Sequence, residues 1–259
     1  MKPFVILDTY FNINHNITEE IIEKAFNGDV KIVSYDDFNT GADLCGFERL
    51  RSFIGAVNPN RQIYFYAIND INILKLVELE KQYPNFKILR DFSDVPNQYS
   101  KTAQMKFLEK NFGEYLPKHT FLNSNMLIKE GVGSGSRGNI SCTDDMVLVE
   151  KIDAKASWIY MGYAENGNIK HKSVGNIEGI YYHSGSKFLE LKDNSPLSLK
   201  FESIVENIIK EFNLTGIFEL EMLEDNEGNL WYVETNFRPA IWCSDFLEDG
   251  VVEFINSQR

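Results

Sequence analysis

The sequence predicts an α+β protein of 259 residues, in which a small α/β unit precedes a larger unit of mixed strands and helices. Over the first ~95 residues, short apolar runs alternate with helical patterns, as in βαβ units. Beyond them, strand-like runs come in pairs joined by short turns, which is typical of antiparallel sheets. The turn-rich segment 94–100 lies between the two patterns. We therefore expect two domains, 1–95 and 96–259.

The first unit contains the strand-like runs PFVILD, VKIVSY, QIYFYAI and FKILRD, with helices expected near residues 18–27 and 70–82. The first run is followed by DTYFN and not by a glycine-rich turn. The G-x-G-x-x-G signature that brings a backbone close to a pyrophosphate is thus missing at this point. This unit is not expected to bind NAD in the usual way.

The second unit begins with a helix for which Ser100 is the expected N-cap and which ends at Gly113. A further helix is expected from Pro196, which occupies the first helical position, to Phe212. The strand-like runs are DMVLVEKI, ASWIYMGY, GIFELEML and NLWYVETN, with ENGN and EDNEG as turns, and a short helix is expected near 245–256. This pattern predicts antiparallel hairpins covered by helices.

Composition excludes several functional classes. The formal net charge is −12 and no basic patch stands out, so nucleic acid and anionic membranes are not expected partners. No segment approaches the ~20 apolar residues that span a bilayer, and the N-terminal run lacks a cleavage site for secretion, so we expect a cytoplasmic protein. The three cysteines match neither a zinc site nor a disulfide framework.

A glycine-rich loop is the first candidate for binding chemistry. Residues 131–138 read GVGSGSRG and follow Lys129, which ends a predicted strand. Glycines let backbone N–H groups approach phosphate oxygens, and the lysine and Arg137 supply positive charge. The same composition also fits a flexible connector, and this alternative stays open on the loop alone.

Oxygen ligands near the C-terminus form the second candidate. Glu234 and Asn236 are two residues apart on a predicted strand, so their side chains share one face, and a hairpin partner brings Glu221 beside them. Two carboxylates and an amide oxygen suit Mg²⁺, which prefers hard oxygen donors. A solvated strand face is the alternative. Against it, Glu234 lies in an apolar run, where an unpaired carboxylate is costly to bury.

Together these segments resemble the ATP-grasp superfamily. LIKEGVGSGSRGN is similar to its lysine strand and glycine loop, LVEK to its adenine hinge, and YVETNFRP to its E-x-N-x-R signature. The three occur in the family order over roughly residues 96–259. The resemblance is to the carboxylate–amine ligase type, as in the large chain of carbamoyl phosphate synthetase and D-alanine–D-alanine ligase. It implies two α+β lobes clasping ATP, preceded by a small Rossmann-like pre-ATP-grasp domain.

The resemblance also implies roles for individual residues. Lys129 and Lys101 contact phosphate, and Arg238 steadies the transferring phosphoryl group, with Lys129 and Arg238 as the catalytic pair. Mg²⁺, for which Mn²⁺ is a substitute, is held by three side chains. The nucleotide-contacting positions are Lys101, Lys129, Gly133, Ser134, Gly135, Ser136, Arg137, Gly138, Glu150, Lys151 and Ile152, and the metal ligands are Glu221, Glu234 and Asn236. Lys101 and Lys151 also fit ordinary surface lysines.

Several positions depart from the family pattern. Glu130 stands where proline often follows the strand lysine, and Ala156 and Ser157 stand where an acidic ribose contact is expected. Only a short segment lies between Gly138 and Met146, so the lid, expected at about 120–190, is trimmed. Glu219, two residues before Glu221, is an alternative metal ligand, but the spacing to Glu234 favours Glu221.

The function implied by the resemblance is that of a ligase. ATP activates a carboxylate as an acyl phosphate, an amine or other nucleophile attacks it, and ADP and phosphate leave. The expected partners are a small carboxylate and an amine, such as amino acids or a peptide, and a homodimer is left open. Two other functions stay open: a nucleotide-binding regulatory module without turnover, and a phosphotransferase acting on a different acceptor.

Overall fold

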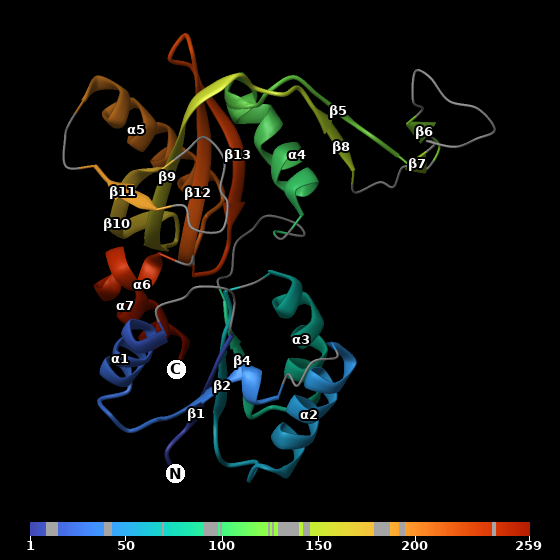
Figure 1. Ribbon diagram of the computed structural model, residues 1–259, viewed down its shortest axis with the longest axis vertical. Helices are drawn as coiled ribbons and strands as arrows, with labels where there is room; N and C mark the ends of the chain where they lie inside the picture. Colours follow the sequence, from blue (N-terminus) through green and yellow to red (C-terminus); the bar gives the residue numbers. More distant parts are fainter. Residues whose placement is uncertain are drawn as a thin grey trace.

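The computed structural model shows a mixed α/β protein in which two sheets are stacked along the long axis (Figure 1). It describes residues 1–8, 15–38, 43–68, 70–90, 98, 100–123, 125, 127–128, 140–141, 146–178, 187–191, 195–239 and 242–259. The predicted boundary between residues 95 and 96 lies outside these ranges. Both termini lie in the lower part of Figure 1, near the smaller sheet.

The smaller sheet has four parallel strands in the order β2-β1-β3-β4, as the alternating pattern predicts. Its strands are β1 (Phe4–Leu7), β2 (Lys31–Ser34), β3 (Ile63–Tyr66) and β4 (Phe86–Leu89). Successive residues of β1 point into two different hydrophobic cores. Val5 and Leu7 belong to one core, and Phe4 and Ile6 belong to the other. Both faces of the sheet are therefore covered, which explains the continuous apolar runs.

Helices α1 (His15–Ala25), α2 (Asp43–Ala56) and α3 (Asp70–Gln82) surround this sheet. Residues of α2 and α3 share the core of Phe4 and Ile6, and residues of α1 share that of Val5 and Leu7. A single 3-10 turn, η1 (Tyr35–Asp37), follows β2. Helices α1 and α3 were predicted from the sequence, but α2 was not. The segment 43–56 contains two glycines and a weak apolar periodicity, so the helix depends on tertiary packing.

The larger sheet has five antiparallel strands in the order β11-β10-β9-β12-β13. They are β9 (Ala154–Glu165), β10 (Asn168–Ile177), β11 (Phe188–Glu190), β12 (Gly216–Asp225) and β13 (Leu230–Asn236). Two predicted hairpin turns are confirmed. Asn166 and Gly167 have positive φ angles of 48° and 72°, as a tight two-residue turn requires, and Gly228 has φ 84° in the β12–β13 turn.

One face of the larger sheet is covered by α4 (Lys101–Phe112) and α5 (Pro196–Glu211), which share a core with Tyr160 and Leu220. The predicted caps are confirmed: Ser100 Oγ accepts from the Ala103 amide at 3.2 Å, and Ser195 Oγ from the Ser198 amide at 3.2 Å. The single turn η2 (Gly113–Tyr115) follows α4.

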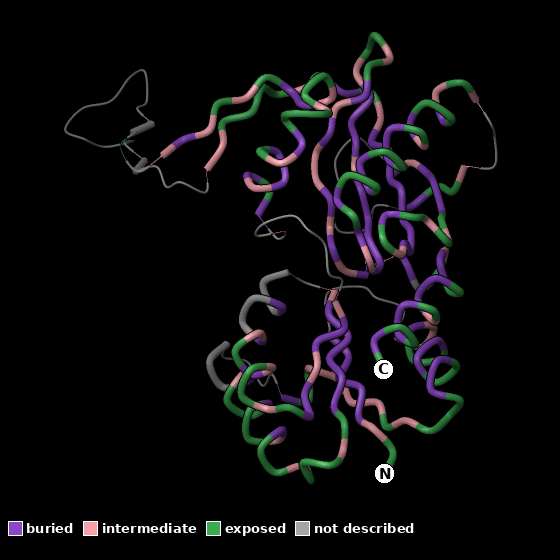
Figure 2. The backbone as a smooth tube through the Cα atoms, turned by 180° about the vertical axis from the view of Figure 1, so that it is seen from behind, coloured by how far each residue is buried: buried purple, intermediate pink, exposed green. Residues whose placement is uncertain are grey.

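The other face is covered by α6 (Cys243–Phe246) and α7 (Glu248–Gln258). These two helices also pack on α1, so the chain's last segment joins the two sheets through one continuous core. Lys87 of β4 donates to the Gln258 carbonyl at 2.5 Å, and Arg259 donates to the Ala25 carbonyl at 2.7 Å. Figure 2 shows the buried strands of both sheets and the buried stretches of these helices between them.

Two short ribbons extend from the larger sheet. β5 (His119–Phe121) pairs with β8 (Val147–Val149), and β6 (Leu127–Ile128) pairs with β7 (Ile140–Ser141), both antiparallel. The ribbons project to one side at the top of the molecule (Figure 1). β9 and β10, which lie within the range expected for the lid, are two strands of the five-stranded sheet. No helix in the described ranges is long and apolar enough to cross a membrane.

Candidate functional site

The hairpin of β12 and β13 brings the predicted metal ligands together. Glu221 lies directly opposite Glu234, and Glu219 lies opposite Asn236. Directly opposite residues of an antiparallel pair project from the same face, so these four side chains form one cluster. That face also carries Ile217, which packs against the α6 and α7 core. The cluster therefore lies on the sheet face opposite to that covered by α4 and α5.

Hydrogen bonds orient the Asn236 side chain within the cluster. Its Nδ2 donates to Glu219 Oε1 at 3.0 Å and to Glu234 Oε1 at 3.3 Å. Its Oδ1 accepts from Arg238 Nη2 at 3.3 Å. Carboxylates only accept and guanidinium only donates, so just one orientation of the amide satisfies all three contacts. The amide oxygen of Asn236 is thus presented on the side of Arg238.

Lys101, the first residue of α4, brings a positive charge to the cluster. Its Nζ forms an ion pair with Glu234 Oε2, although Lys101 belongs to a different element and its side chain is 67% exposed. The Glu234 side chain is only 17% exposed. The sequence analysis placed Lys101 at the phosphates and Glu234 at the metal but did not predict their contact. The structure joins the predicted phosphate lysine directly to a predicted metal ligand.

The donor set fits a small hard cation. Glu221 and Glu234 supply carboxylate oxygens, which are the ligands that Mg²⁺ prefers, and Asn236 would add its amide oxygen if the side chain turned Oδ1 from Arg238 toward the carboxylates. Glu234 already pairs with an ammonium group, which shows that the cluster favours positive charge. In the described ranges, no three His, Cys, Asp or Glu side chains are grouped as ligands of one ion. A cation at this cluster would therefore keep other ligands, as Mg²⁺ does with water and phosphate oxygens.

Glu219 is the member of the cluster that the sequence analysis gave only as an alternative to Glu221. It is 9% exposed, and its Oε2 has no hydrogen-bond partner among the described residues. Burial raises its pKa to about 7, an effect that the nearby Arg238 charge opposes. Burial also raises the pKa of Glu221, although Ser157 Oγ donates to Glu221 Oε1 at 2.8 Å. The alternation Phe-Glu-Leu-Glu in β12 is the signal that places Glu219 on this face.

These shifts predict a pH effect on the metal-free protein. Below about pH 4.5 Glu219 is protonated in both the folded and unfolded states, whereas between pH 4.5 and 7 only the unfolded state loses its proton. Stability should therefore fall as pH rises through this window, by roughly 3 kcal/mol for a shift of this size. We expect Glu219→Gln to remove that loss. The free energy of unfolding of wild type and Glu219→Gln is measured by urea unfolding, in the presence of a chelator, from about pH 4.5 to about pH 8. If it changes with pH in the same way in both proteins, Glu219 is not the group responsible.

The predicted hinge residues lie after β8. The Glu150 amide donates to the Lys118 carbonyl at 2.8 Å, extending the β5–β8 ribbon by one pair. Glu150 and Lys151 are exposed and Ile152 is half-buried. The contacts described for Glu150 are with the ribbon and not with the carboxylate cluster. Lys129 and the loop residues Gly133, Ser134, Gly135, Ser136, Arg137 and Gly138 lie outside the described residues.

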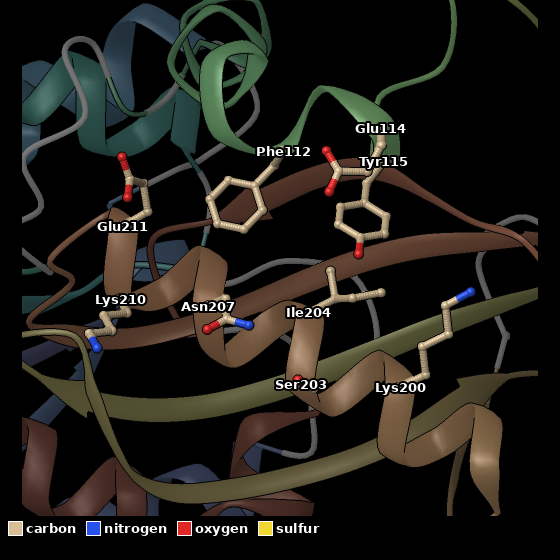
Figure 3. A pocket seen from close by; sticks show the side chains of 9 residues that line it. All are labelled: Phe112, Glu114, Tyr115, Lys200, Ser203, Ile204, Asn207, Lys210 and Glu211. Carbon is tan, nitrogen blue, oxygen red and sulfur yellow. The ribbon is translucent and has the colours of Figure 1, made fainter.

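A separate open groove of about 590 Å³ lies between the end of α4, η2 and α5 (Figure 3). Phe112, Tyr115 and Ile204 give it an apolar side, and two lysines and two glutamates balance in charge around it. None of its lining residues is a predicted site residue, and Ile204 packs in the core on the opposite sheet face from Glu221. We assign no ligand to this groove.

Comparison with solved structures identifies the fold. A D-alanine–D-alanine ligase from Bacillus anthracis, complexed with ATP, superposes with a TM-score of 0.58 at 9% identity over 100% of this chain and 97% of its own. The chain has the ATP-grasp fold. An N5-carboxyaminoimidazole synthetase from Staphylococcus aureus gives a TM-score of 0.59 at 12% identity, covering 99% of this chain and 78% of its own.

A third ATP-grasp structure is similar over almost the whole chain. An L-amino acid ligase from Bacillus licheniformis gives a TM-score of 0.58 at 13% identity, covering 93% of this chain and 68% of its own. No family model and no curated protein matches the sequence. The resemblance drawn from the sequence motifs is thus confirmed at the level of the ATP-grasp fold, by structures and not by sequence relatives.

Proposed function

We propose that this protein is an ATP-dependent ligase that activates a carboxylate as an acyl phosphate for attack by an amine or another nucleophile. The observation that carries the proposal is the convergence of Glu221, Glu234, Asn236, Arg238 and Lys101 on one face of an ATP-grasp sheet. The similar structures include an L-amino acid ligase and a D-alanine–D-alanine ligase, which supports a C–N bond-forming reaction. The carboxylate and amine are small molecules in this proposal.

In this mechanism the protein supplies position and charge. Mg²⁺, held by Glu221, Glu234 and Asn236, would neutralise phosphate charge when bound. Arg238, held beside Asn236 Oδ1, places a guanidinium next to the same ligands, suited to a phosphoryl or acyl-phosphate oxygen. Lys101 stands at the N-terminus of α4, where helix amides add positive potential. No protein nucleophile is required, because positioning and charge neutralisation carry phosphoryl transfer.

The remaining parts of the assignment follow the family arrangement. We propose that residues 1–95 are the pre-ATP-grasp domain, because four parallel strands with helices on both faces form a Rossmann-like unit there. We propose that 96–259 form the ATP-grasp domain, with residues 150–152 at the adenine and the ribbons β5–β8 and β6–β7 as the described part of a trimmed lid. A cytoplasmic location and a homodimer belong to the same proposal.

The reaction products test this function. ADP and phosphate should appear only when a carboxylate and a nucleophile are both present, and hydroxylamine should convert the activated carboxylate into a hydroxamate. A panel of amino acids and short peptides, assayed for phosphate release with and without hydroxylamine, is the direct screen. AMP and pyrophosphate would show adenylation and contradict the proposal. Tight MgATP binding without turnover across the panel would instead support a regulatory nucleotide-binding module.

The proposed phosphate contact of Lys129 gives a binding prediction. Lys129→Ala should weaken MgATP binding at least about tenfold, since a charge-assisted contact contributes on the order of 1.5–3 kcal/mol. Calorimetry measures the change. Lys110→Ala is the control, because it removes the same charge from the exposed last turn of α4. Equal affinities of the two variants would remove Lys129 from the phosphate site.

A further inference from the structure

Gln104 connects α4 to the strand that carries the predicted metal ligands. Its Nε2 donates to the Thr235 carbonyl and to the Gln98 carbonyl, each at 2.8 Å. Its Oε1 accepts from the Thr235 amide at 2.9 Å and from the Tyr232 hydroxyl at 2.6 Å. One side chain thus binds both backbone groups of the residue that lies between Glu234 and Asn236.

The geometry makes this connection stiff. Gln104 is 3% exposed and Thr235 is 1% exposed, so water offers neither residue an alternative partner. An amide side chain has two donor hydrogens and one acceptor oxygen with two lone pairs, and all four are used. A fully satisfied buried polar network holds a single arrangement more firmly than apolar contacts, which permit sliding.

The connection also determines where Lys101 lies. Gln104 is three residues after Lys101, in the first turn of the same helix, and Ser100 caps that turn. The backbone bonds to Thr235 set the distance between this turn and β13. The Lys101–Glu234 ion pair spans the same two elements. Thr235 points into the α4 side of the sheet, while its neighbours Glu234 and Asn236 project from the opposite face.

We propose that Gln104 is a positioning residue of the cation and phosphate site. It would hold the β13 ligands Glu234 and Asn236 and the α4 ammonium of Lys101 in register while touching neither nucleotide nor metal. The inference rests on the proposed function and goes beyond it, because no motif of the sequence marks Gln104. It predicts that removing the amide loosens the metal–nucleotide site more than its effect on overall stability accounts for.

The test compares Gln104→Met, which keeps side-chain length but removes all four hydrogen bonds, with a Leu108 variant. Leu108 is fully buried one turn further along α4, and either Leu108→Val or Leu108→Ala is chosen to match the melting temperature of Gln104→Met. We expect Gln104→Met to bind MnATP at least about tenfold more weakly than wild type, since the loss of supporting contacts behind metal ligands typically costs 10–100-fold. The Leu108 variant should stay within about twofold.

A measurement made without nucleotide separates failure of the Gln104 inference from failure of the proposed function. Hydrogen exchange of the Thr235 amide should be about tenfold or more faster in Gln104→Met than in the matched Leu108 variant. Where Gln104→Met folds too poorly to be measured, Gln104→Asn replaces it. Asparagine keeps an amide but is one methylene too short to reach Thr235, so it should show the same faster exchange and weaker MnATP binding. Exchange and MnATP affinity equal to those of the Leu108 variant would overturn the inference. A wild-type protein that never binds MnATP would overturn the proposed function, and the exchange rates would still decide the role of Gln104.

Discussion

Glu234→Gln is expected to abolish turnover while leaving the fold intact. The glutamine has the same shape and its Oε1 can still accept from Asn236 Nδ2, so the β12–β13 hairpin keeps its packing. It loses the negative charge that pairs with Lys101 and that would bind the cation. Metal-assisted charge neutralisation contributes several kcal/mol to such reactions, so we expect at least about a 100-fold loss of turnover.

Phosphate release with a substrate pair found in the hydroxamate screen measures the effect, and calorimetry with Mn²⁺ and ATP measures binding separately. Glu227→Gln is the matched control, because Glu227 lies exposed in the turn of the same hairpin. It should retain normal turnover. Normal turnover by Glu234→Gln itself would show that the metal site lies elsewhere, because the variant removes a charged ligand with little change of side-chain shape.

Much of the fold could be predicted because its signals are local. The runs FVIL, IYFY and GIFELEML are strands by composition and length, and Ser100 and Pro196 mark helix starts through capping chemistry. Local patterns could not predict which strands pair when the strands are far apart in the sequence. The pairing of β9 with β12 depends on packing and not on any turn, and α2 depends on the neighbouring sheet more than on its own periodicity.

The site shows the same division between local and distant signals. Glu234 and Asn236 were found because alternation along one strand is a property of the strand itself. Glu221 was expected beside them from the hairpin, but it lies opposite Glu234 because a β-bulge shifts the register between Glu221 and Met222. The Lys101–Glu234 ion pair joins residues 133 positions apart, and Gln104 acts through backbone groups of Thr235, for which any residue type would serve. Contacts to a backbone leave no residue-type signature on the partner strand, so sequence motifs miss them.

Lys101→Met should change two affinities in opposite directions. Without nucleotide, the Lys101 ammonium pairs with Glu234 Oε2 and competes with a cation for that oxygen. Removing it should strengthen the binding of Mn²⁺ alone, by a few-fold because the lysine is largely exposed and its ion pair is screened. With nucleotide, the lysine becomes the proposed phosphate contact, so MnATP binding should weaken about tenfold to 100-fold, as for a charge-assisted contact of 1.5–3 kcal/mol.

General damage to the protein would weaken the binding of both Mn²⁺ and MnATP, so it cannot easily change the two affinities in opposite directions. Titration of Mn²⁺ followed by its paramagnetic signal, with and without ATP, measures both affinities in one series. Lys106→Met, which removes an exposed lysine from the middle of α4, is the control and should change neither affinity by more than about twofold. Weaker binding of Mn²⁺ alone would mean that Lys101 supports the cation site and does not compete with it. Unchanged MnATP affinity would return Lys101 to the ordinary surface lysine that the sequence also allows.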